Sequence, residues 1–382
     1  MRPFIVTEIE AGKLPRWGLL LLCVLYVLPG FVGRDPWRTE DAAGFGIALT
    51  MGRGGLSDWL MPNIAGDMVP AHGPLPYWIA GAFARLGSPW APDALFTEHA
   101  MVRLATVLLL AATLALVWYA SFAMARRPGV QPSDPFGASA TSTDFARAIA
   151  DSVLLVTMAT FGLITRMHET TGDVAQVTWV AAFLFGCATA LERPVRGGAI
   201  AGAAIAATLL SRGLPLALAM LVLLIALPPL VRAFCLVRRP MLATAIPVAL
   251  LGALAWPLAL AAGDAAMQQH LADWLQAQAD AASGPSIEGI AYFVRTTPWF
   301  YWPAWPVATW AIWRWRQRWT EPAVALPMLA AAAFSLQALI APQGVEGRLL
   351  PAALPLALLA GVGLPTLRRG IVSLIDWFAV TS

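Results

Sequence analysis

Four short polar segments place ionisable side chains beside long apolar runs: "RDPWRTED" from Arg34, "AHGPLPYW" from Ala71, "TRMHETTGD" from Thr165 and "QGVEGRLLP" from Gln343. A carboxylate can take a proton during a reaction, and an arginine can hold an anionic group. If the four segments meet in one wet pocket, they could support such chemistry at a membrane boundary. The simpler alternative is that each is a solvated loop end, because loop ends are normally polar.

The elements that would position these segments are membrane helices. Of the 382 residues, 59% are hydrophobic and only 12% are charged, whereas soluble domains average about 25% charged residues. Apolar runs near the ~20 residues that cross a bilayer recur along the whole chain. The sequence therefore predicts an all-α, polytopic transmembrane helical bundle and excludes a soluble domain on a single anchor.

The predicted spans form one transmembrane domain, residues 1–382, with about ten or eleven helices. They cover residues 14–32, 101–125, 148–166, 174–191, 197–211, 214–231, 241–262, 298–313, 322–341 and 349–366, with a further one starting near 370. The first run has no small-residue cleavage site, so it is interpreted as a retained span. The two runs that flank Arg212 could equally be one broken helix.

The distribution of charge predicts the orientation. With the amino terminus inside, most arginines fall on the cytoplasmic side, as the positive-inside rule requires, and most acidic residues fall outside. All four polar segments then border spans on the outer face. Lys13 is the only lysine, and this arginine bias indicates a bacterial source with a GC-rich genome, hence the inner membrane.

Two outer, periplasmic loops are long. The first, residues 33–100, contains "LPYWIAGAFARLG", which is too short to span and is predicted to lie along the interface. The second, residues 263–297, contains "DAAMQQHLADWLQAQADA", in which Met267, Leu271 and Trp274 have helical spacing.

Cysteine spacing and net charge indicate no further class of site or partner. Cys23, Cys187 and Cys235 lie in or at the ends of apolar runs without C-x-x-C spacing, which indicates neither a disulfide framework nor a thiolate metal site. The net charge of +3 does not indicate a nucleic-acid partner, because the charges are divided between two sides of a membrane.

The order of the motifs resembles a known family, the GT-C type integral-membrane glycosyltransferases that include the aminoarabinose and protein O-mannosyl transferases. The motifs are "TEDAAGFGIALTM", "HGPLPYW", "TTGDVA", "SRGLPLA" and "GRLLPAALPLALLA", and the resemblance runs from about residue 17 to the end. It implies transfer of a sugar from a polyprenyl (undecaprenyl) phosphate to a lipid, glycan or protein acceptor outside the membrane. Relatives usually continue further, so the chain is expected to be truncated at its carboxyl end.

The resemblance also implies the catalytic acids. Glu40 aligns with the catalytic aspartate of the family and Asp41 with the acid that follows it, although the family more often has Asp and then Glu. Glu40 is the leading candidate for the base, with Asp41 and Asp35 as alternatives. Asp173 aligns with the second important acid, but "TTGD" before a helix is also an N-capping arrangement.

Phosphate binding is implied for Arg348, Arg212 and His72, of which Arg212 and His72 stand where the family has lysines. Arg212 could also be a helix-end residue that faces headgroups. Because a fixed charge is lost at His72, aminoarabinose is a less favoured substrate. His270 resembles a metal-binding histidine in position, but Ala71 replaces a carboxylate ligand. No cofactor is certain, and a divalent metal held by His72 and His270 remains open.

Further candidates for substrate contacts are Asp35, Arg38, His168, Glu169, Tyr77, His270 and Trp299. Arg166, His168 and Glu169 could belong to the site or simply pair with one another. Two other functions remain as alternatives: a transporter or flippase, which should carry ionisable residues near mid-membrane, and a non-enzymatic envelope-assembly protein.

Overall fold

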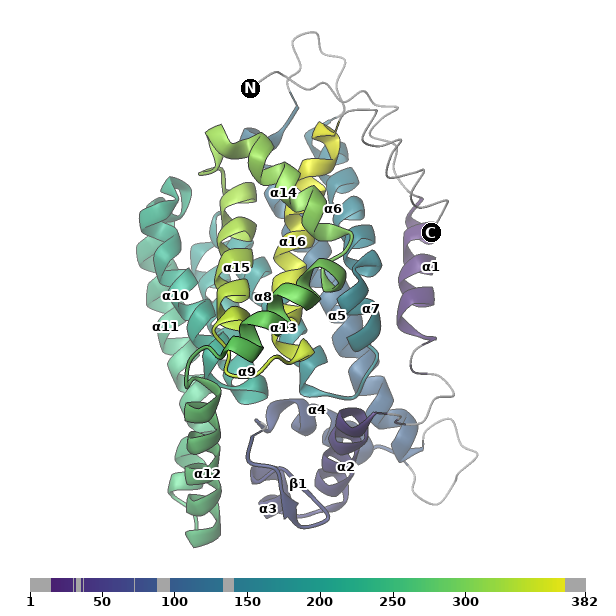
Figure 1. The fold of residues 1–382 in the computed structure, drawn as a ribbon, viewed down its shortest axis with the longest axis vertical. Coiled ribbons are helices and arrows are strands. Elements are labelled where there is room, and N and C mark those ends of the chain that lie inside the picture. The colour runs from purple at the N-terminus through teal and green to yellow at the C-terminus, as the bar shows by residue number, and fades with distance from the viewer. Residues whose placement is uncertain are drawn as a thin grey trace.

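The computed structural model describes residues 15–29, 31, 36, 38–71, 73–87, 97–132 and 141–367. The predicted all-α class is confirmed: helices make up nearly all of the described chain, and the one small sheet is a two-residue pair (Figure 1). The elements up to the middle of the chain are α1 (Arg16–Val27), α2 (Thr39–Arg53), α3 (Leu56–Leu60), β1 (Asn63–Ile64), β2 (Asp67–Met68), α4 (Leu75–Ala84), α5 (Glu98–Ala125), η1 (Pro128–Val130), α6 (Ser142–Ala159), α7 (Phe161–Arg166) and α8 (Gly172–Ala190). The remaining elements are α9 (Pro194–Arg212), α10 (Leu214–Leu230), α11 (Arg232–Ala261), α12 (Ala265–Ala281), α13 (Ile287–Phe300), α14 (Ala304–Trp315), η2 (Arg316–Arg318), α15 (Pro322–Leu339), η3 (Glu346–Arg348), α16 (Leu350–Gly363) and η4 (Leu364–Thr366).

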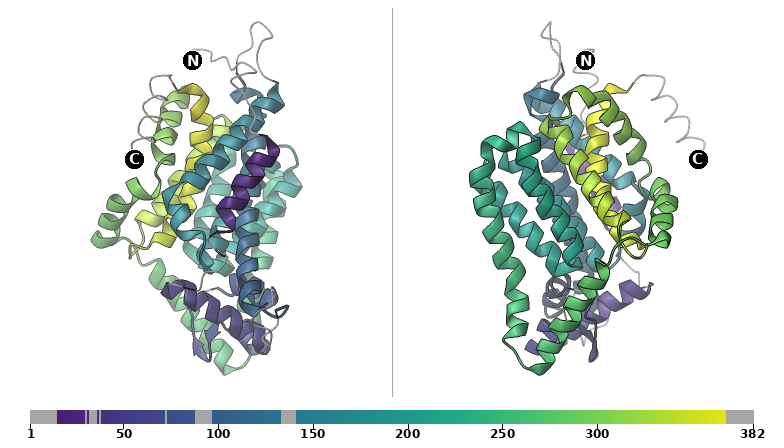
Figure 2. Two further views of the ribbon diagram at one scale, coloured as in Figure 1. Left: turned by 90° about the vertical axis from the view of Figure 1, so that its right-hand side faces the viewer. Right: turned by 60° about the vertical axis from the view of Figure 1, so that its left-hand side comes forward.

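The long helices form a bundle along the longest axis of the molecule. In Figure 1, α2, α3, α4 and the β1–β2 hairpin lie below one end of this bundle, and α12 projects from the same end. We refer to this end of the bundle as the site end. Helix α1 lies on the outside of the bundle, as the left view of Figure 2 shows. Among the described helices, α5, α8, α9, α11 and α15 are long and apolar enough to cross a membrane, so the chain is a multi-pass membrane protein.

Two predicted spans differ from the observed helices. The predicted span 148–166 is broken at Thr160, where the hydroxyl donates to Val156 O (2.8 Å) and the Phe161 N–H donates to Trp302 O (2.9 Å). This tertiary contact ends α6 and starts α7. The span predicted at 298–313 starts only at Ala304, because residues up to Phe300 belong to α13.

The two long loops contain helices, and the helices predicted in them are confirmed. "LPYWIAGAFA" forms α4, and the amphipathic stretch in the second loop forms α12, capped by the Asp264 carboxylate, which accepts the Met267 N–H (2.9 Å). The Trp256 indole N–H donates to Leu60 O (2.7 Å), which ties α11 to α3. The site end is therefore attached to the bundle by specific contacts.

Small residues let α8, α9 and α11 approach closely. A Cβ added to Gly197 would lie 2.2 Å from Ala190 N on α8, and one added to Gly202 would lie 2.3 Å from Ala245 O on α11. Small residues at such crossings are typical of membrane helix packing, where van der Waals contact between backbones drives association. The position of Arg212, at the end of α9, depends on this packing.

We expect Gly202→Leu to destabilise the bundle, because the new side chain must push α11 away from α9. The expected loss of stability is about 1–3 kcal/mol, the usual cost of overpacking a core. Thermal unfolding of the purified protein measures it. The matched control is Ala203→Leu, since Ala203 is exposed on the same helix; equal unfolding temperatures for the two variants would contradict the packing described.

Candidate active site

Arg166 is the centre of an ionic cluster at the site end. Its side chain ends α7 and is 7% exposed. Nη2 contacts Glu40 Oε2 and lies 3.1 Å from Asp173 Oδ2, while Nη1 lies 3.3 Å from Glu169 Oε2. Nε is 3.7 Å from Glu346 Oε2. One guanidinium thus faces four carboxylates contributed by α2, α8, the loop before α8 and η3.

Asp173 is held from several sides in the first turn of α8. Its Oδ1 lies 3.1 Å from Arg212 Nε and accepts a hydrogen bond from Gln176 Nε2 (3.0 Å), which also donates to Gly347 O (2.8 Å). The Asp173 N–H donates to Thr171 Oγ1, which caps the helix. The capping role that "TTGD" could indicate therefore falls to Thr171, and the Asp173 carboxylate belongs to the cluster.

Glu40 and Asp41 are neighbours in the first turn of α2, but their environments differ. The Glu40 side chain is 51% exposed, whereas Asp41 is fully buried. Asp41 Oδ1 accepts the Thr170 N–H (2.6 Å), and Oδ2 lies 3.7 Å from Arg103 Nη2. One turn further on, a Cβ at Gly44 would lie 1.9 Å from Thr170 O. Glu40 is open to a substrate, while Asp41 fastens α2 to α5 and to the loop before α8.

The turn between α9 and α10 positions Arg212. Gly213 adopts φ = 93°, and a Cβ there would lie 1.8 Å from Gln278 Oε1. That same oxygen accepts the Leu214 N–H (2.9 Å). A left-handed glycine is needed at this position, and α12 secures the turn through Gln278.

Arg348 approaches the cluster from η3. Its Nη1 donates to Ala281 O (3.3 Å) at the end of α12. Burial lowers the pKa of Arg348, and the positive charge of Arg212 lowers that pKa further. The two positive charges therefore repel one another, and an anion bound near both would relieve this repulsion.

Glu169, like Asp173, is a deeply buried carboxylate of the cluster, at 1% exposure. Its Oε1 lies 3.2 Å from Arg38 Nη1, and its Oε2 faces Arg166. Burial raises the pKa of Glu169 to about 7, although the charges of Arg166 and Arg38 oppose the rise. Arg38 also reaches Glu346 (3.9 Å), so it closes a ring of charges around Arg166.

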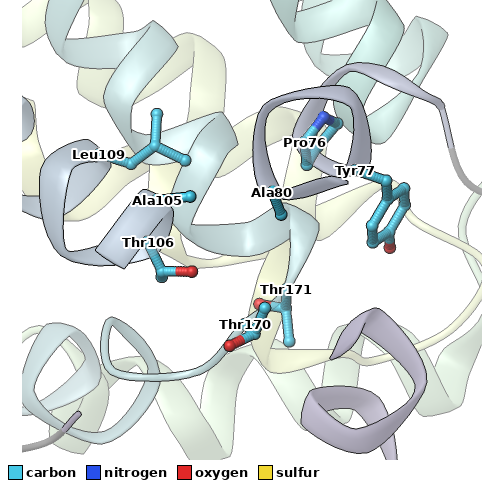
Figure 3. A pocket seen from close by; sticks show the side chains of 8 residues that line it. All are labelled: Pro76, Tyr77, Ala80, Ala105, Thr106, Leu109, Thr170 and Thr171. Atoms are coloured by element: carbon cyan, nitrogen blue, oxygen red, sulfur yellow. The ribbon is translucent and has the colours of Figure 1, made fainter. Parts of the chain in front are cut away.

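Tyr77 lies behind the cluster on α4 and is 3% exposed. Burial raises its pKa, and the charges of Arg212, Asp173 and Glu40 act on it. Tyr77 is one of the residues that line a small cavity between α4, α5 and the loop before α8 (Figure 3). The cavity is lined by Pro76, Tyr77, Ala80, Ala105, Thr106, Leu109, Thr170 and Thr171. Its volume of about 10 Å³ matches one water molecule, so no sugar fits there.

Three predicted substrate residues are not among the contacts of the ionic cluster. His168 contacts α1, with Nε2 2.7 Å from Tyr26 O. His270 is buried against Trp256, with ring centroids 6.3 Å apart. Trp299 is 75% exposed on α13. The ionic cluster therefore forms without these side chains.

A metal site finds no support in the described part of the chain. No group of three His, Cys, Asp or Glu side chains there could hold a metal ion. Both ring nitrogens of His270 lack a hydrogen-bond partner, and the buried side chains around it are apolar or indole rings. Asp35 and His72 lie outside the described residues. The described side chains do not fit a divalent cation, and we assign it no step.

Three residues of the site were given no role from the sequence: Arg103, Gln176 and Glu346. Arg166 was considered only as a possible member of the site or a partner of its neighbours, and it lies at the centre of the cluster. Arg103 stands alone in the apolar stretch "MVRLATVLLL", and an isolated intramembrane charge is a signal for a buried partner. Glu346 stands two residues before Arg348 in a segment that was recognised. Gln176 carries no such signal, because a glutamine one turn into a helix is common.

Comparisons with known proteins identify solved structures that share the fold of this chain. No family model matches the chain, and no curated protein matches it. Two crystal structures match in fold: ArnT from Cupriavidus metallidurans bound to undecaprenyl phosphate, with a TM-score of 0.73, and the same protein in the apo state, with a TM-score of 0.69. This chain shares the fold of ArnT. The match covers 95% of this chain and 62% of ArnT at 17% identity, so the chain spans less than two thirds of the length of ArnT.

The ArnT fold agrees with the expected GT-C architecture, that is, a polytopic helical membrane protein with helices in its first long loop. At this identity the match establishes the fold alone.

Proposed function

We propose that this chain is a polyprenyl-phosphate-dependent glycosyltransferase. The observation that carries the proposal is the arrangement at the site end: a half-exposed carboxylate, Glu40, shares Arg166 with buried Asp173, which in turn contacts Arg212 beside Arg348. In this proposal Glu40 supplies the base, and Arg212 and Arg348 bind the anionic group. The similarity to ArnT bound to undecaprenyl phosphate supports a polyprenyl phosphate as partner.

Arg348 and Arg212 are proposed to bind the donor phosphate. Among the described residues, no carboxylate lies within 4.0 Å of Arg348, whereas Arg212 already pairs with Asp173 (3.1 Å). A phosphate between the two arginines would relieve their repulsion and gain charge-assisted hydrogen bonds. His72 is a third proposed contact, on the strength of the family resemblance alone.

Glu40 is proposed to act as the general base. The acceptor hydroxyl attacks the anomeric carbon of the donor sugar, and its proton passes to the Glu40 carboxylate. A new glycosidic C–O bond forms as the bond between the anomeric carbon and the phosphate oxygen breaks. The electron pair of that bond leaves with polyprenyl phosphate, whose charge Arg348 and Arg212 neutralise. Attack opposite the leaving phosphate would invert the anomeric configuration.

Asp173 and Asp41 are proposed to have different roles in this reaction. Asp173 contacts both Arg166 and Arg212, so it links the base to the phosphate site and borders the reacting sugar. Asp41, the alternative base, is fully enclosed and bonded to Thr170. Its proposed contribution is to hold α2, and with it Glu40, against the bundle.

The reaction is proposed to take place at the periplasmic face of a bacterial inner membrane, with the amino terminus in the cytoplasm. The acceptor is a lipid, a glycan or a protein. Arg38 and Tyr77 lie beside the cluster and are proposed substrate contacts. Asp35, His168, Glu169, His270 and Trp299 were further candidates. The positions of His168, His270 and Trp299 make them less favoured, and Glu169 is less favoured because it is enclosed between Arg38 and Arg166.

The test is release of undecaprenyl phosphate by the purified, detergent-solubilised protein. A panel of undecaprenyl-phosphate sugars is incubated with a bacterial envelope extract as the source of acceptor, and the lipid product is measured by mass spectrometry. At least one donor should be consumed in proportion to added enzyme. No turnover with any sugar, from a protein that binds undecaprenyl phosphate, would contradict the transferase and favour a transport or assembly role.

A further inference from the structure

Among the described carboxylates of the cluster, Glu169 is the buried one that is contacted by arginines alone. Its side chain is 1% exposed, and both of its oxygens lack a hydrogen-bond donor of normal geometry. Its two close neighbours are positively charged: Arg38 Nη1 lies 3.2 Å from Oε1, and Arg166 Nη1 lies 3.3 Å from Oε2. Burying a carboxylate is costly unless it is paired, so such a residue contributes chiefly through its charge.

The contact with Glu169 fixes the orientation of Arg166. A guanidinium is planar and presents its nitrogens in a rigid fork. Because Nη1 is directed at Glu169, the other terminal nitrogen, Nη2, is directed between Glu40 and Asp173 (3.1 Å). Rotation of the fork would separate Nη2 from at least one of those acids.

We propose that Glu169 is a positioning residue for sugar transfer: its charge holds the Arg166 guanidinium in the one orientation that keeps Glu40 and Asp173 together. Glu169 itself touches neither donor nor acceptor. The inference rests on the proposed transferase function and adds to it a residue whose effect is exerted through Arg166.

Charged groups face Glu169 from every segment packed around it. Arg38 precedes α2 and Arg166 ends α7, and both favour the ionised form; Asp41 on α2 and Asp173 on α8 favour the neutral form. Burial is the largest influence and brings the pKa to about 7. Glu169 is therefore neutral below that pH, when it no longer holds Arg166, and charged above it.

The decisive variant is Glu169→Gln, which keeps the shape of the side chain and removes the charge. We expect kcat to fall by about tenfold to a hundredfold, since small misplacements of catalytic groups have effects of that size, while the KM for the undecaprenyl-phosphate sugar changes by no more than about twofold. Glu169→Asp keeps the charge and should recover part of kcat. The matched control is Glu346→Gln, because Glu346 also approaches Arg166 (3.7 Å) but is 43% exposed; its effect should be smaller.

The dependence of kcat on pH is a second readout, and a merely structural role of Glu169 would not change it. In the wild-type protein, kcat should fall as the pH decreases through about 7, because Glu169 takes up a proton and releases Arg166. In Glu169→Gln this limb of the profile should be absent. The wild-type profile alone tests the idea if the Gln variant does not fold: a flat kcat between about pH 6 and about pH 8 contradicts it.

Failure of this inference can be distinguished from failure of the proposed function. If the wild-type protein consumes no donor of the panel, the transferase itself is wrong. If the wild-type protein is active and Glu169→Gln keeps its kcat and its pH profile, Glu169 has no positioning role. An equal loss in Glu346→Gln and Glu169→Gln would also contradict the special role of the buried charge.

Discussion

Glu40→Gln is expected to lower kcat for sugar transfer by about a hundredfold to ten-thousandfold, the usual contribution of a general base. The amide occupies nearly the same volume, but it cannot accept the proton of the acceptor. Because the Glu40 side chain is 51% exposed, the substitution should leave folding intact. Initial rates of undecaprenyl phosphate release, at saturating donor, measure the effect.

The control for this prediction is Glu288→Gln, which removes an exposed carboxylate from the first turn of α13. This variant should keep the wild-type rate. If Glu40→Gln turned over as fast as Glu288→Gln, Glu40 could not be the base. A collapse of activity in Asp41→Asn with unchanged unfolding temperature would instead favour Asp41, the alternative that its burial disfavours.

Arg348→Ala should weaken binding of the donor lipid by about tenfold to a hundredfold. A hydrogen bond to a charged group contributes about 1.5–3 kcal/mol, and every 1.4 kcal/mol is about a factor of ten in affinity. The loss should appear mainly in the dissociation constant, since the base at Glu40 remains in place. Binding of a fluorescent undecaprenyl-phosphate analogue in detergent micelles measures it.

Arg16→Ala is the comparison variant for the phosphate site. Arg16 is exposed at the start of α1, away from the site end, and its removal should leave donor affinity unchanged. Equal affinities of Arg348→Ala and Arg16→Ala would contradict a phosphate at Arg348. Lower affinity in Arg212→Ala with no change in Arg348→Ala would place the phosphate on the α9 side of the cluster.

The convergence of the polar segments could be predicted from the sequence, because each of them borders an apolar run. Glu40, Asp173, Arg212 and Arg348 were recognised by their order along the chain. In the structure Glu40 and Asp173 contact Arg166, Arg212 contacts Asp173, and the charge of Arg212 acts on Arg348. Their proposed roles stay predictions. The central place of Arg166 could not be foreseen, because it depends on the break at Thr160, which turns α7 toward the site.

Two other features depend on tertiary contacts that periodicity does not reveal. When a loop helix and a membrane span are both apolar, composition alone does not separate them. The predicted span 298–313 therefore started too early, inside α13, whereas α14 begins at Ala304. The different surroundings of Glu40 and Asp41 follow from the close approach of Gly44 to Thr170. The motif resemblance ranks Glu40 ahead of Asp41 by alignment alone, whereas the structure shows that Glu40 is half-exposed and Asp41 is fully buried.

The most direct test of the central claim is an experimental structure of this protein with undecaprenyl phosphate bound in a lipid nanodisc. The account predicts the phosphate between Arg348 and Arg212, within hydrogen-bonding distance of both guanidinium groups, with Glu40 on the far side of Asp173 and facing the open end of the site. A phosphate bound away from both arginines, or a Glu40 carboxylate separated from the site by packed protein, would contradict it.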